Sequence, residues 1–158
     1  MALKKLIVVR HGKYAEKSLT AEGRRQVAEL ATALAIQLHQ SSIALLSSTA
    51  TRAKETSVIL AAGLGGITFE EHECLFSGGY NLDSEQVEET FRLLEENGST
   101  HDVVILSTHM EFIDQFPTIW GKKHGFQIQK SYDTPKGTAR LVNVETGKVE
   151  DIHPTSTF

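Results

Sequence analysis

Arg10 and His11 stand directly after an apolar run at residues 6–9, and Gly12 follows them. A short apolar run predicts a buried strand, and a glycine after it supplies the backbone freedom for a sharp exit. Arginine is a permanent cation that can hold an oxyanion, while the imidazole of histidine can attack an electrophile or carry protons. Because open α/β sheets bind their ligands at the carboxyl ends of strands, the pair favours an anion-processing site over a strand that merely ends in two polar residues.

Two further junctions between a strand and a helix carry basic side chains. A second apolar run, residues 43–46, leads through a serine-rich turn to Arg52 in the first turn of a predicted helix. The apolar run at residues 103–106 is followed by one serine and then by Thr108 and His109. Junctions of this polarity share one edge of a parallel sheet, so the two arginines and two histidines are expected to converge. Arginine binds phosphate through a bidentate fork, and a helix N-terminus adds partial positive charge, so the expected ligand is a phosphoryl group.

The elements that position these residues alternate between strand and helix along the chain. Short apolar runs predict strands at residues 6–9, 43–46, 67–69 and 103–106. Apolar residues at helical spacing predict helices at residues 20–39, 51–62, 83–98 and around 112–120. Thr20 and the Asp83–Gln86 pair have the side chains of helix caps, Pro117 is expected to break or restart the fourth helix, and residues 138–152 predict a β-hairpin. This alternation predicts one domain, residues 1–158, built as a three-layer α/β/α sandwich with a mainly parallel central sheet.

The composition is that of an ordinary soluble globular protein. Of the 158 residues, 40% are hydrophobic and 23% are charged, and the net charge of −4 gives no sign of a nucleic-acid partner. The single cysteine, Cys74, excludes an internal disulfide framework and agrees with a reducing compartment. The apolar stretch before Arg10 is too short for a signal peptide, and no segment is long enough to span a membrane. The expected location is the cytoplasm.

Charges are unevenly distributed along the chain. Residues 69–97 are strongly acidic, which we interpret as the solvated face of a helix. Residues 121–140 carry five bases: Lys122, Lys123, Lys130, Lys136 and Arg140. Such a stretch either attracts an anionic substrate or forms solvated surface, and the sequence leaves both interpretations open.

The sequence does not indicate a metal site. The five histidines outside the junctions lack the spacing of metal ligands, and one cysteine offers no set of thiolates: His39, His72, His101, His124 and His153. A cysteine phosphatase is excluded as well, because its phosphate loop needs an arginine at the sixth position after the cysteine, where Tyr80 stands. We therefore expect neither a metal ion nor a cofactor.

Four blocks of sequence, in order and with matching spacing, resemble the histidine phosphatase superfamily. They lie at residues 8–12, 19–23 (followed by Gln26), 47–56 and 104–109. This group includes the cofactor-dependent phosphoglycerate mutases, the fructose-2,6-bisphosphatases and the small SixA-type phosphohistidine phosphatases. The resemblance implies a phosphoglycerate mutase-like fold and hydrolysis of a phosphate compound through a phosphohistidine intermediate.

The resemblance also implies roles for individual residues. His11 corresponds to the nucleophile that becomes phosphorylated, and Arg10, Arg52 and His109 correspond to the groups that bind the transferring phosphoryl group. A departure from the usual family pattern is Thr49, which stands where many members have proline.

The family usually supplies a carboxylic acid from the region after the third strand. Glu73 is the first candidate for this acid, and Glu71 and Glu111 are its rivals. Contacts to the substrate are further expected from residues that adjoin the quartet: Gly12, Lys13 and Thr108. Tyr14 borders the same predicted pocket.

The segment between Gly12 and Leu19 is short, at residues 13–18, where the mutases place a much longer substrate-binding segment. This favours a compact phosphatase of the SixA kind, whose substrate is a phosphorylated protein side chain, with phosphohistidine first. The main alternative is a phosphatase for a small phosphate ester, such as a sugar phosphate or a nucleotide-like ester. A catalytically silent phosphate-binding module is disfavoured, since a pure binder does not require both histidines.

Overall fold

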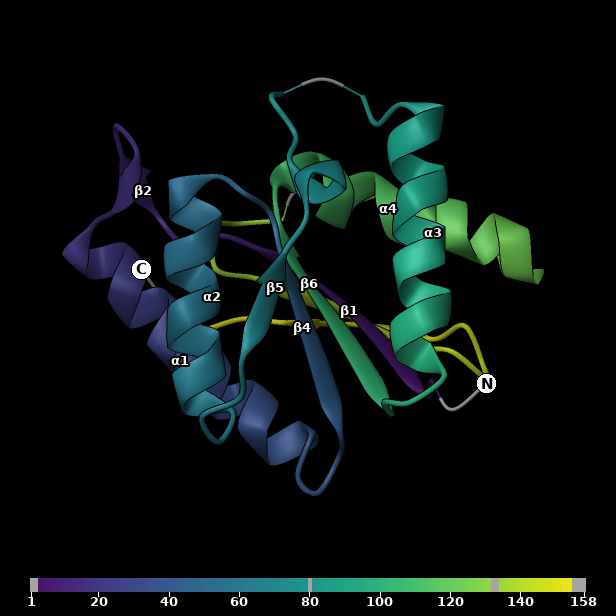
Figure 1. Cartoon of the computed structure of the whole chain (residues 1–158), viewed down its shortest axis with the longest axis horizontal. Helices are drawn as coiled ribbons and strands as arrows, with labels where there is room; N and C mark the ends of the chain where they lie inside the picture. The colour runs from purple at the N-terminus through teal and green to yellow at the C-terminus, as the bar shows by residue number, and fades with distance from the viewer. Residues whose placement is uncertain (1–2, 80, 132–133, 155–158) are drawn as a thin grey trace.

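A computed structural model describes residues 3–79, 81–131 and 134–154 and contains a twisted sheet of six strands (Figure 1). In spatial order these are β5 (Phe69–Glu71), β4 (Ile43–Ser47), β6 (Val103–Thr108), β1 (Lys5–Arg10), β7 (Ala139–Asn143) and β8 (Val149–Ile152). The first four are parallel to one another, whereas β7 runs antiparallel to β1 and β8 antiparallel to β7. The mainly parallel sheet predicted from the sequence is confirmed.

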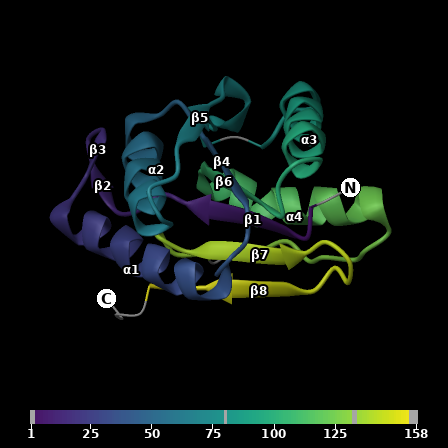
Figure 2. The ribbon, with the colours of Figure 1, turned by 60° about the horizontal axis from the view of Figure 1, so that its bottom comes forward.

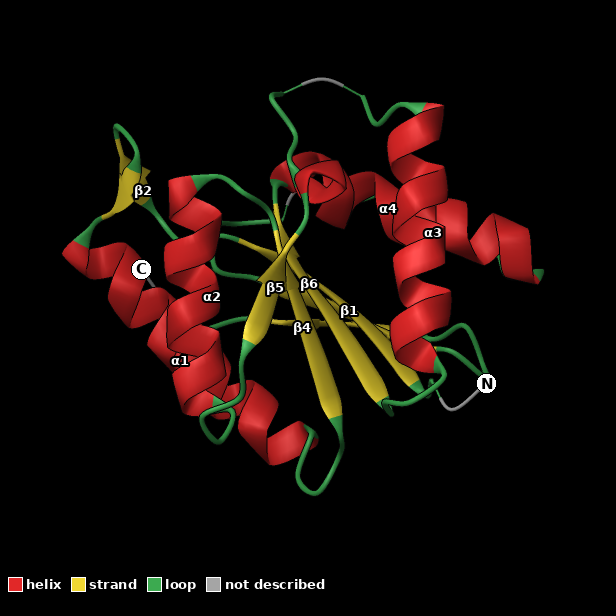
Figure 3. Ribbon diagram, viewed as in Figure 1, coloured by secondary structure: helices red, strands yellow, loops and turns green. Residues whose placement is uncertain are grey.

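Helices cover both faces of this sheet (Figures 2 and 3). Helices α1 (Ala21–Gln37) and α2 (Thr51–Gly63) lie on one face, and α3 (Ser84–Gly98) and α4 (Met110–His124) lie on the other. Alternate residues of β1 serve the two cores, because side chains along a strand point to opposite faces. Leu6 and Val8 pack with the residues of α3 and α4, while Ile7 and Val9 pack with those of α1 and α2.

Three short elements complete the described chain. A small hairpin, β2 (Tyr14–Ala15) and β3 (Ser18–Leu19), connects β1 to α1, and a 3-10 turn, η1 (Glu73–Leu75), follows β5. No helix in the described ranges combines the length and the apolar character that crossing a bilayer requires.

Two predicted helix starts are confirmed in atomic detail. The Thr20 hydroxyl accepts a hydrogen bond from the backbone N–H of Gly23 at 3.0 Å and caps α1. At α3, Asp83 and Gln86 form the predicted capping box, with each side chain accepting from the other residue's backbone N–H. These bonds satisfy donors that the first turn of a helix otherwise leaves unpaired.

Two details of the predicted elements are wrong. Helix α4 continues through Pro117 without a break. Proline removes one backbone hydrogen bond, but Phe112, Phe116 and Trp120 are buried on both sides of it and hold the helix against the sheet. The third parallel strand lies at Phe69–Glu71 instead of 67–69, because its register is set by pairing with residues 45–47 of β4.

Gly12 and Gly23 allow the exit of β1 to lie directly on the start of α1. A Cβ atom on Gly23 would stand 1.9 Å from the carbonyl oxygen of Lys13, and one on Gly12 would stand 2.7 Å from the carbonyl oxygen of Gly23. Gly12 is not among the glycines with positive φ. The glycine after the strand therefore gives room for close packing, whereas the sequence had suggested a need for backbone freedom.

Candidate active site

The four basic residues from the three predicted junctions meet at the carboxyl edge of the parallel strands. Arg10 is the last residue of β1 and His11 follows it, Arg52 lies in the first turn of α2, and His109 is the N-cap of α4. All four line one cavity of about 300 Å³. The predicted convergence of two arginines and two histidines is therefore observed in the structure.

His11 has its two ring nitrogens in different surroundings. Nδ1 is 3.0 Å from the carbonyl oxygen of Gly12, and Nε2 accepts a hydrogen bond from Nε of Arg52 at 3.2 Å. Nε2 therefore carries the lone pair and Nδ1 carries the hydrogen. Burial is the main cause that lowers the pKa of His11 to about 4, and the hydrogen bond to Gly12 opposes this shift. The positive charges of Arg52 and Arg10 lower the pKa as well. The ring is a neutral imidazole at pH 7.

His109 has the opposite arrangement. Nη2 of Arg52 lies 3.5 Å from its Nδ1, and the hydroxyl of Ser48 lies 2.8 Å from its Nε2. Since arginine only donates, Nδ1 accepts and Nε2 carries the hydrogen that Ser48 receives. Burial lowers the pKa of His109 to about 3, and His11 and Arg52 add to this effect. Ser48 fixes the orientation of this ring. Ser48 was not among the residues predicted from the sequence, although its position directly after β4 is a signal that it lies at the same edge of the sheet.

Arg10 is held by the segment that precedes β7. Its Nη1 donates to the carbonyl oxygen of Thr134, whose hydroxyl donates to Asp114 of α4. Burial lowers the pKa of Arg10, while the carboxylates of Asp114 and Glu111 oppose this shift. Burial also raises the pKa of Asp114. Among the described residues, the buried Nε of Arg10 has no hydrogen-bond partner, so this N–H is uncommitted.

The three candidate carboxylates lie in different places. Glu111, in the first turn of α4, is only 8% exposed and lines the cavity with the basic quartet. Glu73 is exposed and lines a neighbouring cavity of about 630 Å³, which shares Ser77 and Gly78 with the first. Glu71 is exposed and pairs with Lys54 at 3.7 Å. The structure thus places Glu111 in the cavity of the four basic residues, and it places the first candidate, Glu73, in the neighbouring cavity.

The three expected substrate contacts do not belong to the described lining of the cavity. Gly12 is buried and its N–H donates to the hydroxyl of Thr56 at 3.3 Å. Lys13 is exposed, and its ammonium group pairs with Glu22 at 2.8 Å. Thr108 is buried, and its hydroxyl donates to the carbonyl oxygen of Leu75. The bonds of Gly12 and Thr108 thus connect neighbouring buried segments, and Lys13 lies at the surface.

Tyr14 and Lys136 line the cavity as well. Tyr14 was expected at its border, while Lys136 appeared in the sequence only as one base of a basic stretch. Arg140, another member of that stretch, is buried on β7 and forms a two-pronged pair with Asp151. The basic stretch therefore divides into residues with different roles, and one of them faces the site.

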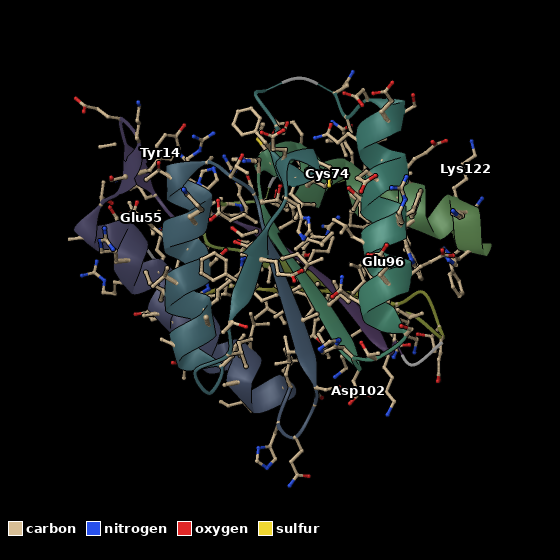
Figure 4. All side chains as sticks on the ribbon, viewed as in Figure 1. Tyr14, Glu55, Cys74, Glu96, Asp102 and Lys122 are labelled. Carbon is tan, nitrogen blue, oxygen red and sulfur yellow. The ribbon has the colours of Figure 1, made fainter. Side chains whose placement is uncertain are left out.

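Cys74 lies outside this cavity, between the sheet and α3 (Figure 4). It packs against the core, and burial raises the pKa of its thiol. Such a thiol is a poor nucleophile, because the thiolate is the reactive form. Within the ranges that the structure describes, no three His, Cys, Asp or Glu residues are grouped so that they could hold a metal ion.

Comparison with solved structures identifies the fold. The protein histidine phosphatase SixA complexed with tungstate is similar with a TM-score of 0.72 and 18% identity, over 95% of this chain and 97% of that one. The putative phosphohistidine phosphatase SixA from Agrobacterium tumefaciens is similar with a TM-score of 0.64 and 15% identity, over 89% and 92%. A mycobacterial glucosyl-3-phosphoglycerate phosphatase complexed with VO3 gives a TM-score of 0.66 and 14% identity, over 98% of each chain.

Comparison at the level of sequence gives a family match over the N-terminal part of the chain. No curated protein sequence matches the chain. Residues 6–76 match the model of the histidine phosphatase superfamily (branch 1), a range that includes Arg10, His11 and Arg52 and ends before His109. Together with the four converging side chains and the shared fold, this match supports the resemblance to the histidine phosphatase superfamily found in the sequence.

Proposed function

We propose that the protein is a phosphatase that works through a phosphohistidine on His11. The observation that carries this proposal is the state of His11: a neutral imidazole whose Nε2 lone pair is held beside Arg52 in the cavity. A neutral imidazole is the nucleophilic form of histidine. The guanidinium groups of Arg10 and Arg52 line the same cavity and are suited to the terminal oxygens of a phosphoryl group.

In the first half of the reaction, Nε2 of His11 attacks phosphorus from the side opposite the leaving group. The bond from phosphorus to the leaving oxygen or nitrogen breaks as the phosphorus–nitrogen bond to His11 forms. The two arginines stabilise the charge on the terminal oxygens, which is the main form of catalysis available for phosphoryl transfer, and His109 orients the guanidinium group of Arg52 through its Nδ1. A proton from Glu111 neutralises the leaving group, and the position of Glu111 in the lining supports this role better than that of Glu73.

In the second half, water attacks the phosphorus of the phosphohistidine. Glu111, now a carboxylate, accepts the proton of the water, and the bond between phosphorus and Nε2 breaks. The products are inorganic phosphate and the neutral imidazole of His11. The hydrogen bond from Nδ1 of His11 to Gly12 keeps the same tautomer through the cycle.

The proposed substrate is a phosphohistidine side chain of another protein, as for the SixA proteins whose fold is similar. Two large apolar side chains at the site support a protein substrate. Phe76 packs edge-on against His109 and is 44% exposed, and Met110, in the cavity lining, is 42% exposed. These side chains give a protein substrate apolar area to bury around its phosphorylated residue.

A small phosphate ester is the second candidate substrate. It is supported by the similarity of fold to a glucosyl-3-phosphoglycerate phosphatase and by the additional cation, Lys136, in the cavity. Initial rates with a phosphohistidine peptide, a set of sugar phosphates and nitrophenyl phosphate separate the two candidates. A kcat/KM highest for the peptide supports the protein substrate, and a kcat/KM highest for a sugar phosphate supports the alternative.

Trapping of the phosphoenzyme tests the mechanism. Brief incubation with a 32P-labelled substrate followed by denaturation is expected to leave acid-labile, alkali-stable label on the wild-type protein and none on His11→Ala. The control, Cys74→Ala, is expected to keep both label and turnover. Substantial turnover by His11→Ala contradicts covalent catalysis at His11.

We also propose that the reaction needs no metal ion, since side chains supply the positive charge around the phosphoryl group. Activity after exhaustive chelation is expected to equal that of the untreated protein. Vanadate and tungstate are expected to inhibit by occupying the phosphoryl position. A loss of activity on chelation that Mg²⁺ or Zn²⁺ restores contradicts this part of the proposal.

A further inference from the structure

Lys136 is a cation in the catalytic cavity that the family resemblance does not assign. Its side chain lines the cavity together with Arg10, His11 and Arg52. Its ammonium group lies 5.5 Å from the ring centroid of Tyr14. None of the ion pairs formed among the described residues involves Lys136. The charge therefore lies in the cavity of His11 without an ion pair to a described carboxylate, although Glu111 lines the same cavity.

The backbone around Lys136 is fixed to the catalytic strand on both sides. Nη1 of Arg10 donates to the carbonyl oxygen of Thr134, before Lys136. After Lys136, the N–H of Gly137 donates to the carbonyl oxygens of Arg10 and His11 at 3.1 and 3.0 Å, and the N–H of Arg10 donates to Thr138 at 2.9 Å. Gly137 has a φ of +77°, which a residue with a Cβ adopts only at a cost. The position of Lys136 relative to His11 is thus set by the active-site backbone itself.

Tyr14 connects Lys136 to the rest of the site. Its ring meets the ring of His11 edge-on, with 5.1 Å between centroids, and Cζ of Arg52 lies 4.8 Å from its centroid. The negative face of an aromatic ring attracts cations, with a free energy of about 0.5–1 kcal/mol at exposed positions. That attraction is weaker than a charge-assisted hydrogen bond, which is typically about 1.5–3 kcal/mol. An arriving phosphoryl dianion therefore outcompetes the ring for the ammonium group.

We propose that Lys136 is a third phosphoryl-binding cation, which rests on Tyr14 in the free enzyme and transfers to a terminal phosphoryl oxygen on binding. Arg10 and Arg52 supply forks for the other oxygens, and the ammonium group adds a mobile point charge on a flexible stem. This inference rests on the proposed function for the identity of the substrate. The binding of a tetrahedral oxyanion is a separate property that can be measured without turnover.

A charge already present on the substrate is bound equally in the ground state and in the transition state, so Lys136 acts mainly on affinity. For nitrophenyl phosphate, Lys136→Ala is expected to raise KM about 10-fold, the size of one partly exposed charge-assisted hydrogen bond, with a much smaller change in kcat. Lys136→Arg is expected to restore most of the loss, because it retains the charge.

The decisive experiment is calorimetric titration of the protein with tungstate. Relative to wild type, Lys136→Ala is expected to raise Kd about 10-fold, and Lys136→Arg is expected to stay within about 3-fold. The matched control is Lys122→Ala, since Lys122 is an exposed lysine at the end of α4 that lies far from Tyr14 (Figure 4). Its Kd is expected to equal that of wild type. Thermal unfolding of each variant verifies that the fold is retained.

Tyr14→Leu tests the resting position. Without the ring, the ammonium group no longer has to leave Tyr14, so the effects of Tyr14→Leu and Lys136→Ala on the Kd for tungstate are expected to be non-additive. Additive effects contradict the transfer from ring to oxyanion.

Other outcomes separate this inference from the proposed function. A wild-type Kd for Lys136→Ala overturns the inference, and so does an equal loss for Lys136→Ala and Lys122→Ala, which indicates a general effect of net charge. If the wild-type protein binds tungstate but hydrolyses no phosphate compound, the proposed function fails. The role of Lys136 in anion binding is still decided by the titration.

Discussion

The Nε–H of Arg52 donates to Nε2 of His11 over 3.2 Å, so the proposed nucleophile is held by the group that we also propose to bind the incoming phosphoryl group. In the free protein this bond points the lone pair of His11 toward the guanidinium group. When a phosphoryl group binds, its oxygens provide better acceptors for the guanidinium, and the lone pair becomes available to attack. We therefore expect Arg52 to couple binding of the substrate to exposure of the nucleophile.

Loss of this guanidinium is expected to be costly. Arg52→Ala should lower kcat/KM for nitrophenyl phosphate by ~10²–10³-fold, the range seen when one donor to a developing oxyanion is removed. Arg52→Lys should recover little of this, because lysine lacks the planar fork that reaches His11, His109 and the phosphoryl oxygens together. Steady-state kinetics with both variants is the measurement, and rates near wild type in either variant contradict the coupling.

Buried neutral histidines also predict how stability depends on pH. In the folded protein the pKa values of His11 and His109 are about 4 and about 3, below the ordinary value of 6.5 that both regain on unfolding. Between pH 6.5 and 4 the unfolded state therefore binds more protons, so the free energy of unfolding falls as the pH falls. Each histidine should account for roughly 1–2 kcal/mol between pH 7.5 and 5.

The measurement is urea unfolding at these two pH values for wild type, His11→Asn and His109→Asn. Each variant removes one titrating group and should show a smaller loss of stability at pH 5. Identical pH dependence in all three proteins would mean that the two histidines titrate normally in the folded state.

The choice between Glu111 and Glu73 as proton donor predicts a dependence on the leaving group. An alkoxide needs protonation as it leaves, whereas nitrophenolate needs little help. Glu111→Gln should therefore slow aliphatic phosphate esters most, by ~10²-fold or more, phosphohistidine mildly and nitrophenyl phosphate least. Glu73→Gln is the matched control and should keep wild-type rates with all three substrates. The reverse pattern would restore the sequence-based candidate.

Gly23 is expected to tolerate no side chain, although it lies inside a helix. Alanine raises helix propensity by about 1 kcal/mol over glycine. Here its Cβ would meet the carbonyl oxygen of Lys13 at 1.9 Å, a backbone atom held at the exit of β1. Overpacking of this kind typically costs about 1–3 kcal/mol, so the clash outweighs the gain. Urea unfolding of Gly23→Ala should show net destabilisation, and a more stable variant would contradict the contact.

Much of the fold was predictable because local signals and tertiary packing agree. Asp83 and Gln86 form their capping box from side chains three residues apart, which the sequence displays directly. The strand end at Arg10 and His11 was predictable for the same reason, since a buried apolar run precedes it. The predicted break at Pro117 was wrong because the burial of Phe112 and Phe116 against the sheet, a tertiary effect, outweighs the local effect of a proline.

The incomplete part of the site depends on contacts between distant segments. The first choice, Glu73, follows the third parallel strand as the family pattern suggests, yet it faces a neighbouring cavity. Glu111 enters the lining because His109 begins α4 and the first turn of that helix faces the arginines. Lys136 is far from His11 in sequence and reaches it through the hydrogen bonds of Gly137. The positions of these residues follow from three-dimensional packing, so no periodic pattern in the sequence predicts them.

The reversed direction of β7 beside β1 has a consequence for how substrate preference can be altered. Parallel strands bring the loops that follow them to the catalytic edge, whereas an antiparallel neighbour brings the loop that precedes it. The part of the cavity wall that contains Lys136 therefore follows, in the sequence, the three junctions that supply Arg10, His11, Arg52 and His109. Substitutions at Lys136 can therefore alter this wall while β1, β4 and β6 keep their register. The position of Lys136 is accordingly the place to vary when the proposed preference among phosphate compounds is to be changed.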